Sequence, residues 1–324
     1  MLLRQRIAVL VLFLATVTLH RSGPEDSIAV PAIKGIVDDC KQHPVLIIGE
    51  AHWLKEAGDF YIRLVRDPEF QRTVQDIIVE FASRNNQPLL DRYISGEDVP
   101  IQDVRRIWRD TTKVASWDSP IYAQWLAAIR EVNRGLPVSR RLRVLAGDTP
   151  VEWSRIHNHT DWVALGDNNI SFADVIINEV LKKKHRALVV LGTNHITKSG
   201  DREGGENTTT RVELRYPGST HVVLLIYHRT LDQAAQDLLR LPNQKTPVLF
   251  ELTESSLSKL ADQDGSPLIK KTDALLYLGP PDSLDMVLPP AGSLEPAYLK
   301  EVDRRSMIEW GELRARKFLG AAAQ

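Results

Sequence analysis

The chain has very little cysteine: Cys40 is the only one among 324 residues. An intrachain disulfide needs two cysteines and a cysteine-rich zinc site needs several, so both are excluded. Neither sign of charge is in excess, because Lys+Arg 41 against Asp+Glu 42 leave a net charge of −1. This balance gives no indication of a nucleic-acid partner. Hydrophobic residues at 43% and charged residues at 26% exclude a disordered, collagenous or multispanning protein.

Several widespread catalytic motifs are also missing. The sequence contains no Gly-x-Ser-x-Gly elbow, no P-loop, no His-Glu-x-x-His and no Gly-x-Gly-x-x-Gly. The chemistries that those motifs carry are therefore not supported.

The N-terminal segment has a basic start followed by a short apolar run. Arg4 and Arg6 precede Ile7 to Leu19, a stretch without charge that has the length of a signal-peptide core, not of a bilayer-spanning helix. Residues 1–22 are predicted to be a signal peptide, with an uncleaved N-terminal anchor or a buried first helix as alternatives. We expect an exported protein, periplasmic or extracellular, that contacts a membrane only through this segment if it is uncleaved.

The remainder, residues 30–324, alternates short apolar runs with amphipathic stretches and contains no linker that would separate two domains. This pattern predicts a single α/β domain whose mixed, mostly parallel sheet is flanked by helices. A helical insertion is expected near residues 97–135, which hold Trp108, Trp117 and Trp125. The predicted strands are Val45–Ile48, Ile77–Phe81, Leu142–Ala146, Ala187–Leu191, Val222–Tyr227, Val248–Glu251 and Ala274–Leu278.

Polar residues follow four of these strands where each strand ends. Glu50 and His52 follow the first, and an extended chain would project them to the same side. Glu80 lies near the end of the second, Asp148 ends the third, and His195 follows the fourth. Ligands of open α/β sheets bind at the carboxyl ends of the strands. A carboxylate and an imidazole there can transfer protons or hold a metal.

The two histidines share a spacing. Gly49-Glu50-Ala51-His52 and Gly192-Thr193-Asn194-His195 each place a histidine three residues after a glycine that ends an apolar run. A third match, Gly218 to His221, precedes its apolar run instead of ending it. We treat that third match as chance, because the other two are selected by their place at the end of an apolar run and not by the spacing alone.

This combination resembles the clan that joins the ChaN haem-binding proteins, the Tiki and TraB proteins and the erythromycin esterases. The similarity is closest to ChaN, whose glycine-to-histidine spacing is that of Gly49 to His52 and whose run after the second strand is similar to Glu80–Tyr93. The resemblance spans about residues 43–197. It implies either a hydrolytic site, in which Glu50, His52, Glu80 and His195 would be catalytic, or a site that handles haem or iron.

The resemblance also implies further roles. His52, Glu80 and His195 would hold a divalent metal if one is bound, and Arg84 would bind an anionic group or an oxyanion. Asp148 and Arg109 are further substrate-binding candidates, although Arg109 could instead form an ion pair with Asp110 or Asp103. Haem is the alternative cofactor, but no tyrosine matches the ChaN iron ligand; Tyr61 and Tyr93 are only available tyrosines.

The predicted function is hydrolysis of an ester or amide bond in a small-molecule or peptide substrate. His52 or Glu80 would act as general base on water, and His195 would polarise the carbonyl group or hold a metal. The alternatives are an exported haem- or iron-binding protein of the ChaN type and a degenerate relative that binds a partner. Lys198–Asn207 is predicted to be a loop, either a mobile lid or a plain surface connection.

Overall fold

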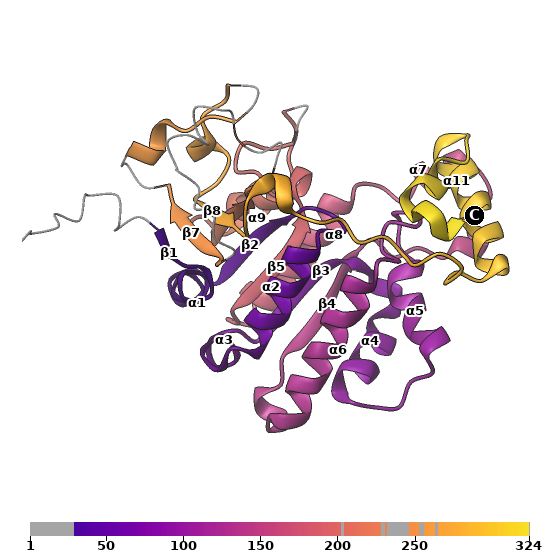
Figure 1. The fold of residues 1–324 in the computed structure, drawn as a ribbon, viewed down its shortest axis with the longest axis horizontal. Coiled ribbons are helices and arrows are strands. Elements are labelled where there is room, and N and C mark those ends of the chain that lie inside the picture. The colour runs from indigo at the N-terminus through magenta and orange to yellow at the C-terminus, as the bar shows by residue number, and fades with distance from the viewer. Residues whose placement is uncertain are drawn as a thin grey trace, which may run out of the picture.

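In the part of the chain that the structure describes, eight strands form a mixed sheet at the centre of the molecule (Figure 1). The computed structural model describes residues 29–201, 204–227, 231, 246–252, 256–262 and 265–323. The strands are β1 (Ala29–Pro31), β2 (Val45–Glu50), β3 (Asp76–Ser83), β4 (Arg143–Asp148), β5 (Ala187–Gly192), β6 (Thr220–Leu225), β7 (Val248–Glu251) and β8 (Ala274–Tyr277). Their order is β1-β7-β8-β6-β2-β5-β3-β4. Among the strands of the described ranges, only β7 runs antiparallel to both its neighbours, so the predicted mixed, mostly parallel sheet is confirmed.

Helices cover both faces of the sheet. The α-helices are α1 (Ala32–Gln42), α2 (Lys55–Arg66), α3 (Pro68–Thr73), α4 (Gln87–Ser95), α5 (Ile101–Arg109), α6 (Pro120–Gly135), α7 (His159–Val163), α8 (Asn168–Val175), α9 (Thr208–Arg215) and α11 (Pro296–Trp310). A π-helix, Ile176–Leu181, continues α8. Short 3-10 helices are Arg84–Asn86, Val138–Arg140, Trp153–Arg155, Thr193–His195, Ser256–Lys259, Leu268–Lys270, Pro281–Ser283 and Arg314–Ala323.

The central strands form because their side chains are apolar on both faces. In β2, Leu46 and Ile48 pack into the core under α1, α2, α4 and α6, whereas Val45 and Ile47 pack on the opposite side against α8. All of β2, β3 and β5 is buried. Because both faces of these strands are buried, their sequences are nearly unbroken runs of Val, Ile and Leu.

The segment expected as an insertion contains α5 and α6. Helix α6 packs against α2 and α4 in the layer that covers one face of the sheet. The connection between α5 and α6 carries Thr112, Lys113 and Trp117 to the carboxyl end of the sheet. The C-terminal helix α11 lies beside α7 (Figure 1).

Two predictions fall outside or partly outside the described residues. The predicted signal peptide or anchor, residues 1–22, lies outside them, and no helix in the described ranges is long and apolar enough to cross a membrane. In the predicted loop Lys198–Asn207, residues 202 and 203 also lie outside, while Asn207 caps α9.

Candidate active site

The four predicted polar strand ends meet at one edge of the sheet. Strands β2, β5, β3 and β4 are consecutive and parallel, so their carboxyl ends lie side by side. A β-carbon added to Gly192 would lie 3.2 Å from Glu80 Oε2, 3.4 Å from His52 Cε1 and 3.7 Å from His195 Cδ2. The structure therefore brings His52, Glu80 and His195 together around the end of β5.

Glu50 orients His52. The Glu50 Oε2 atom accepts a hydrogen bond from His52 Nδ1 at 2.6 Å, and Tyr122 in α6 donates its hydroxyl hydrogen to Glu50 Oε1 at 2.7 Å. Burial alone lowers the pKa of His52, but the negative charge of Glu50, with a smaller effect of Glu80, raises it to about 8. At neutral pH His52 is therefore mostly protonated.

The backbone after His52 is held in an unfavourable conformation. Trp53 has φ 67°, a left-handed value that costs about 1–3 kcal/mol for a residue other than glycine. Its indole donates to the Ser116 carbonyl oxygen at 2.6 Å, and the ring of Trp117 packs edge-on against His52 at 4.5 Å. The segment between α5 and α6 thus fixes the position of the imidazole.

Glu80 and His195 form the second pair. Glu80 Oε2 accepts a hydrogen bond from the Gly192 backbone N–H at 2.6 Å, while Glu80 Oε1 lies 3.6 Å from His195 Nε2. Burial raises the pKa of Glu80, but both histidines and the Gly192 N–H outweigh that effect, so the pKa is lowered and Glu80 is ionised. Burial lowers the pKa of His195, and the attraction of Glu80 does not offset it.

Asn169 in α8 determines which nitrogen of His195 carries the proton. The Asn169 Oδ1 atom accepts from the backbone N–H of Thr208 at 3.2 Å and from its hydroxyl at 3.0 Å, so this atom is the amide oxygen. His195 Nδ1 lies 2.9 Å from the same oxygen. The proton of neutral His195 is therefore on Nδ1, and the lone pair on Nε2 faces Glu80.

Asp148 has a different environment. It is fully buried, and Thr112 donates to it twice at 2.6 Å, from the backbone N–H to Oδ2 and from the hydroxyl to Oδ1. Burial outweighs these hydrogen bonds and raises the pKa of Asp148 to about 7. Asp148 thus anchors the segment between α5 and α6 to the end of β4.

This anchor gives a stability prediction. Replacing Thr112 by Val removes the hydroxyl donor and leaves Asp148 Oδ1 without it, so we expect the free energy of unfolding to fall by about 1–3 kcal/mol. Urea denaturation measures this change. Thr160→Val, at an exposed position in α7, is the control, and equal stabilities of the two variants would contradict the anchoring role.

A hollow of about 410 Å³ lies beside His195, within the range of small-molecule sites. Besides His195, its lining residues include Lys113, Trp162, Asp167 and Asn168. The positive charge of Lys113 also acts on His52, Glu80 and Asp148. A cation from the segment that precedes α6 therefore lines the hollow with His195 and acts electrostatically on both histidines.

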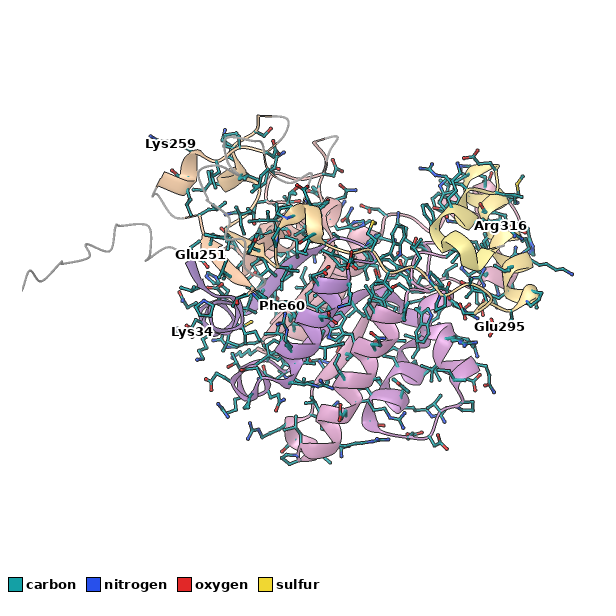
Figure 2. All side chains as sticks on the ribbon, in the orientation of Figure 1. Lys34, Phe60, Glu251, Lys259, Glu295 and Arg316 are labelled. Atoms are coloured by element: carbon teal, nitrogen blue, oxygen red, sulfur yellow. The ribbon has the colours of Figure 1, made fainter. Side chains whose placement is uncertain are left out.

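The structure does not bring the two predicted arginines to this hollow. Arg84 is exposed and lines a separate groove along β4. Arg109 is held by Asp118 and Glu295, each at 2.9 Å, and its guanidinium stacks on Tyr298 at 3.8 Å; Figure 2 labels Glu295 near the C-terminal helices. Neither of the predicted ion pairs, to Asp110 or Asp103, is the pair that Arg109 forms.

The residues proposed for a metal or for haem iron fit those groups poorly. Among the described residues, donor atoms of His52, Glu80 and His195 do not all come within 4.8 Å of one another. Nδ1 of each histidine is already engaged, by Glu50 or Asn169. Tyr61 stacks on Trp125, and Tyr93 lies under Arg130. Neither tyrosine lines the hollow beside His195, so the metal and haem assignments stay predictions and carry no chemical step below.

Sequence reasoning missed four residues that shape the site: Lys113, Thr112, Tyr122 and Asn169. None belongs to a catalytic or binding motif, although Asn169 opens the Asn-x-Ser sequence Asn169–Ser171. Tyr122 and Asn169 lie within helices, where a lone tyrosine or asparagine has no distinguishing neighbour. Their only signal is three-dimensional, since each contacts a residue at the end of a strand.

Comparison with known proteins identifies the fold. No protein-family model and no curated protein sequence matches the chain. A succinoglycan biosynthesis protein of known structure has a TM-score of 0.56 at 10% identity, covering 80% of this chain and 92% of its own. An erythromycin esterase mutant, EreC, has a TM-score of 0.55 at 10% identity, covering 78% and 94%. The chain shares the fold of these two proteins.

A haem-bound ChaN of Campylobacter jejuni is less similar, with a TM-score of 0.38 at 11% identity over 75% of this chain and 90% of its own. The fold assignment rests on the two stronger likenesses. At the level of the fold, the predicted resemblance to the erythromycin esterases is confirmed. Likenesses at such low sequence identity show the fold only. The activity has to be inferred from the residues of the candidate site.

Proposed function

We propose that this protein hydrolyses an ester or amide bond, with His195 as general base and His52 as general acid. The observation that carries the proposal is the different support of the two imidazoles at one sheet edge: His52 Nδ1 bonds to the Glu50 carboxylate, and His195 Nδ1 bonds to the Asn169 amide oxygen. In agreement with this geometry, Glu50 raises the pKa of His52, whereas burial lowers that of His195. When neighbouring titratable groups have their pKa values pushed apart, one is suited to act as the acid and the other as the base. The fold shared with an esterase, EreC, supports the same class of reaction.

His195 is suited to activate water. Its Nε2 atom has a lone pair, and the 3.6 Å to Glu80 Oε1 is too long for a hydrogen bond. One water molecule to the side of the two atoms can instead donate a hydrogen to each of them. As the water oxygen attacks the carbonyl carbon, its proton moves to Nε2 of His195, which Glu80 stabilises as it becomes positive.

His52 is suited to complete the reaction. Glu50 occupies Nδ1, so the Nε2–H of the imidazolium can stabilise the carbonyl oxygen as negative charge develops, and Lys113 adds a second positive charge. When the bond to the leaving group breaks, His52 donates this proton to the departing alkoxide or amine. These roles are the reverse of those expected from the sequence, where His52 or Glu80 was the base and His195 polarised the carbonyl group.

A substrate screen tests the proposal. The full chain is assayed with p-nitrophenyl esters of different acyl length and with peptide p-nitroanilides, and its metal content and haem absorption are measured in parallel. We expect turnover that the His52→Gln variant loses. Stoichiometric haem without turnover of either substrate type would contradict hydrolysis and favour the alternative, an exported haem- or iron-binding protein.

Because little space surrounds Gly192, we expect its replacement by alanine to lower activity without lowering stability. Gly192 has φ −55° and ψ 142°, which alanine adopts readily, but its β-carbon would lie 3.2 Å from Glu80 Oε2 and displace the carboxylate. We expect Gly192→Ala to lower kcat/KM by about tenfold, because small displacements of reacting groups are costly. Gly135→Ala, where nothing lies within 4 Å, is the control. Wild-type turnover in Gly192→Ala would show that Glu80 does not need its present position.

A further inference from the structure

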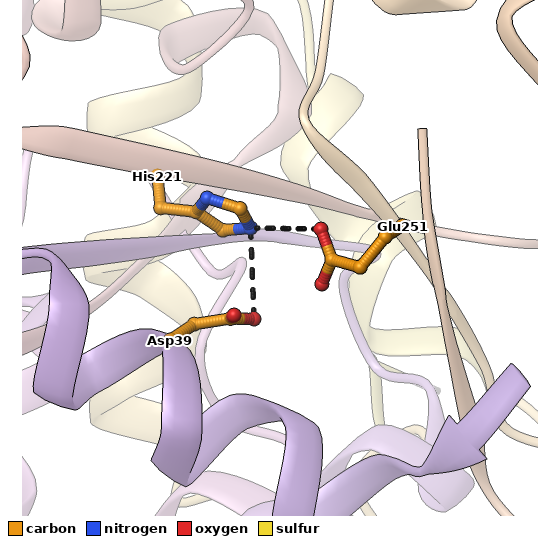
Figure 3. Close-up of side chains that lie close together, drawn as sticks. All are labelled: Asp39, His221 and Glu251. Atoms are coloured by element: carbon orange, nitrogen blue, oxygen red, sulfur yellow. Dashed lines mark ion pairs between the residues drawn. The ribbon is translucent and has the colours of Figure 1, made fainter. Parts of the chain in front are cut away.

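A second cluster of titratable side chains lies at the opposite, amino-terminal edge of the sheet. It consists of Asp39 from α1, His221 from β6 and Glu251 from β7, which converge as shown in Figure 3. His221 Nε2 lies 3.5 Å from Asp39 Oδ2 and 3.6 Å from Glu251 Oε2. One donor atom from each residue lies within 4.8 Å of the other two. Nothing in the proposed hydrolysis uses these residues.

The sheet register explains why Glu251 and His221 meet. Because β7 is antiparallel to β8, its last residue reaches the beginning of β8, where Glu251 pairs with Ala274, and Ala274 pairs with Val223 of β6. Paired residues share a face, and so do residues two apart in one strand. Glu251 and His221 therefore project from the same face, with only the small side chain of Ala274 between their strands.

Helix α1 approaches this face unusually closely. A β-carbon on Gly35 would lie 2.7 Å from Leu249 Cδ2 and 2.8 Å from Val30 Cγ2, so a larger residue would force these side chains to move. Asp39 comes one turn after Gly35 and is on the same side of the helix. The close approach carries the Asp39 carboxylate to His221 and Glu251.

The distances suit metal ligands better than hydrogen bonds. His221 Nε2 lies 3.5 Å from Asp39 and 3.6 Å from Glu251, beyond the about 2.7–3.2 Å of an N–H···O hydrogen bond. The two carboxyl groups interact with each other through a shared hydrogen, which a bound metal ion would replace. Donor atoms that share one tetrahedral zinc ion at about 2.0–2.2 Å lie about 3.3–3.6 Å apart. Among the described residues, neither His221 Nε2 nor Asp39 Oδ2 has a hydrogen-bond partner, although His221 is only 7% exposed.

Positive charge acts on the cluster only from its surroundings, where Lys198, itself paired with Asp273, lowers the pKa of His221. No lysine or arginine of the described ranges forms an ion pair with Asp39 or Glu251. Burial raises the pKa of both carboxyl groups; the charge of Asp39 and the hydrogen bond between the two groups raise that of Glu251 further, to about 8, and burial lowers the pKa of His221. Buried carboxylates are costly unless they are paired or bind a metal, and a neutral imidazole is the form that binds metal.

We propose that Asp39, His221 and Glu251 bind a divalent transition-metal ion of the zinc class. One imidazole nitrogen and two carboxylate oxygens supply three ligands, and water completes the tetrahedron. The Glu251 side chain, 33% exposed, leaves a route for the ion from solvent. The bound ion links α1 to β6 and β7, so its role is to stabilise the packing of α1 against the sheet.

Metal binding by the full chain tests this proposal. After chelation and dialysis, the protein is titrated with Zn²⁺, and with Co²⁺ as a spectroscopic probe of tetrahedral coordination. We expect one equivalent to bind and the melting temperature to rise with zinc concentration. Glu251→Gln and His221→Ala should weaken binding by about 100-fold or more, since partners that merely orient a ligand are already worth about 10–100-fold.

Two controls separate this site from other sources of binding. Asp38→Asn changes the residue next to Asp39, which is paired instead with Lys34 and Lys41, and should leave affinity unchanged. His195→Gln alters the candidate active site and should also leave it unchanged, so the metal proposal can fail or succeed apart from the proposed hydrolysis. Unaltered stoichiometry and affinity in both Glu251→Gln and His221→Ala would overturn the metal site, as would loss of the ion only in His195→Gln.

Discussion

Replacing His195 by glutamine is expected to lower kcat/KM for ester hydrolysis by about 10²–10⁴-fold, the usual contribution of a general base. Glutamine retains a polar side chain of similar reach but has no basic nitrogen to take the proton of water. Since the Nε2 lone pair acts in the transition state, the loss should appear in kcat more than in KM. Steady-state kinetics on the best ester of the screen measures it.

The matched control for this variant is His157→Gln, because His157 is an exposed histidine that contributes nothing to the site. Circular dichroism and thermal unfolding establish that both variants fold. A His195→Gln enzyme within a few-fold of the wild type would remove His195 from the mechanism.

Replacing Glu50 by glutamine is expected to shift the pH dependence. In the wild type, activity should rise as His195 loses its proton below its ordinary pKa, and fall as His52 loses its proton with a pKa of about 8. Glutamine removes the negative charge that raises the pKa of His52 while burial continues to lower it. The descending limb should therefore move to lower pH by about 1–3 units, the effect of one nearby opposite charge.

The pH profile of kcat/KM measures this shift, with Glu97→Gln, at an exposed residue paired to Arg92, as the control. The ascending limb belongs to His195 and should move little in Glu50→Gln. An unchanged descending limb would show that His52 is not the group that must be protonated.

The sheet and the positions of its polar strand ends follow from local sequence. Buried parallel strands are short, continuous apolar runs, and a polar residue directly after such a run lies at the carboxyl edge wherever the strand stands in the sheet. Strand β1 was not predicted because Ala29–Pro31 has three residues and ends in proline, too short for any periodic pattern.

The protonation states and partners of the individual site residues depend on contacts between segments remote in sequence, and local sequence does not reveal them. Which histidine is neutral depends on Asn169 and Thr208 around His195 and on Glu50 beside His52, and spacing does not reveal these contacts. Arg109 was wrongly expected to pair with Asp110 or Asp103, because a long side chain can reach Asp118 and Glu295 on segments remote in sequence. His221 was treated as a chance match because its neighbours Asp39 and Glu251 lie in α1 and in the antiparallel strand β7, far from it in sequence.

The central claim is that His52 and His195 hold opposite protonation states at the same edge of the sheet. Nitrogen-15 NMR of the histidine side chains across a pH titration tests it without any substrate, with His52→Gln and His195→Gln assigning the signals. We predict a pKa of about 8 for His52 and, for His195, a value below the usual about 6.5 with the neutral-form proton on Nδ1. A lower pKa for His52 than for His195, or a neutral His195 protonated on Nε2, would contradict the account.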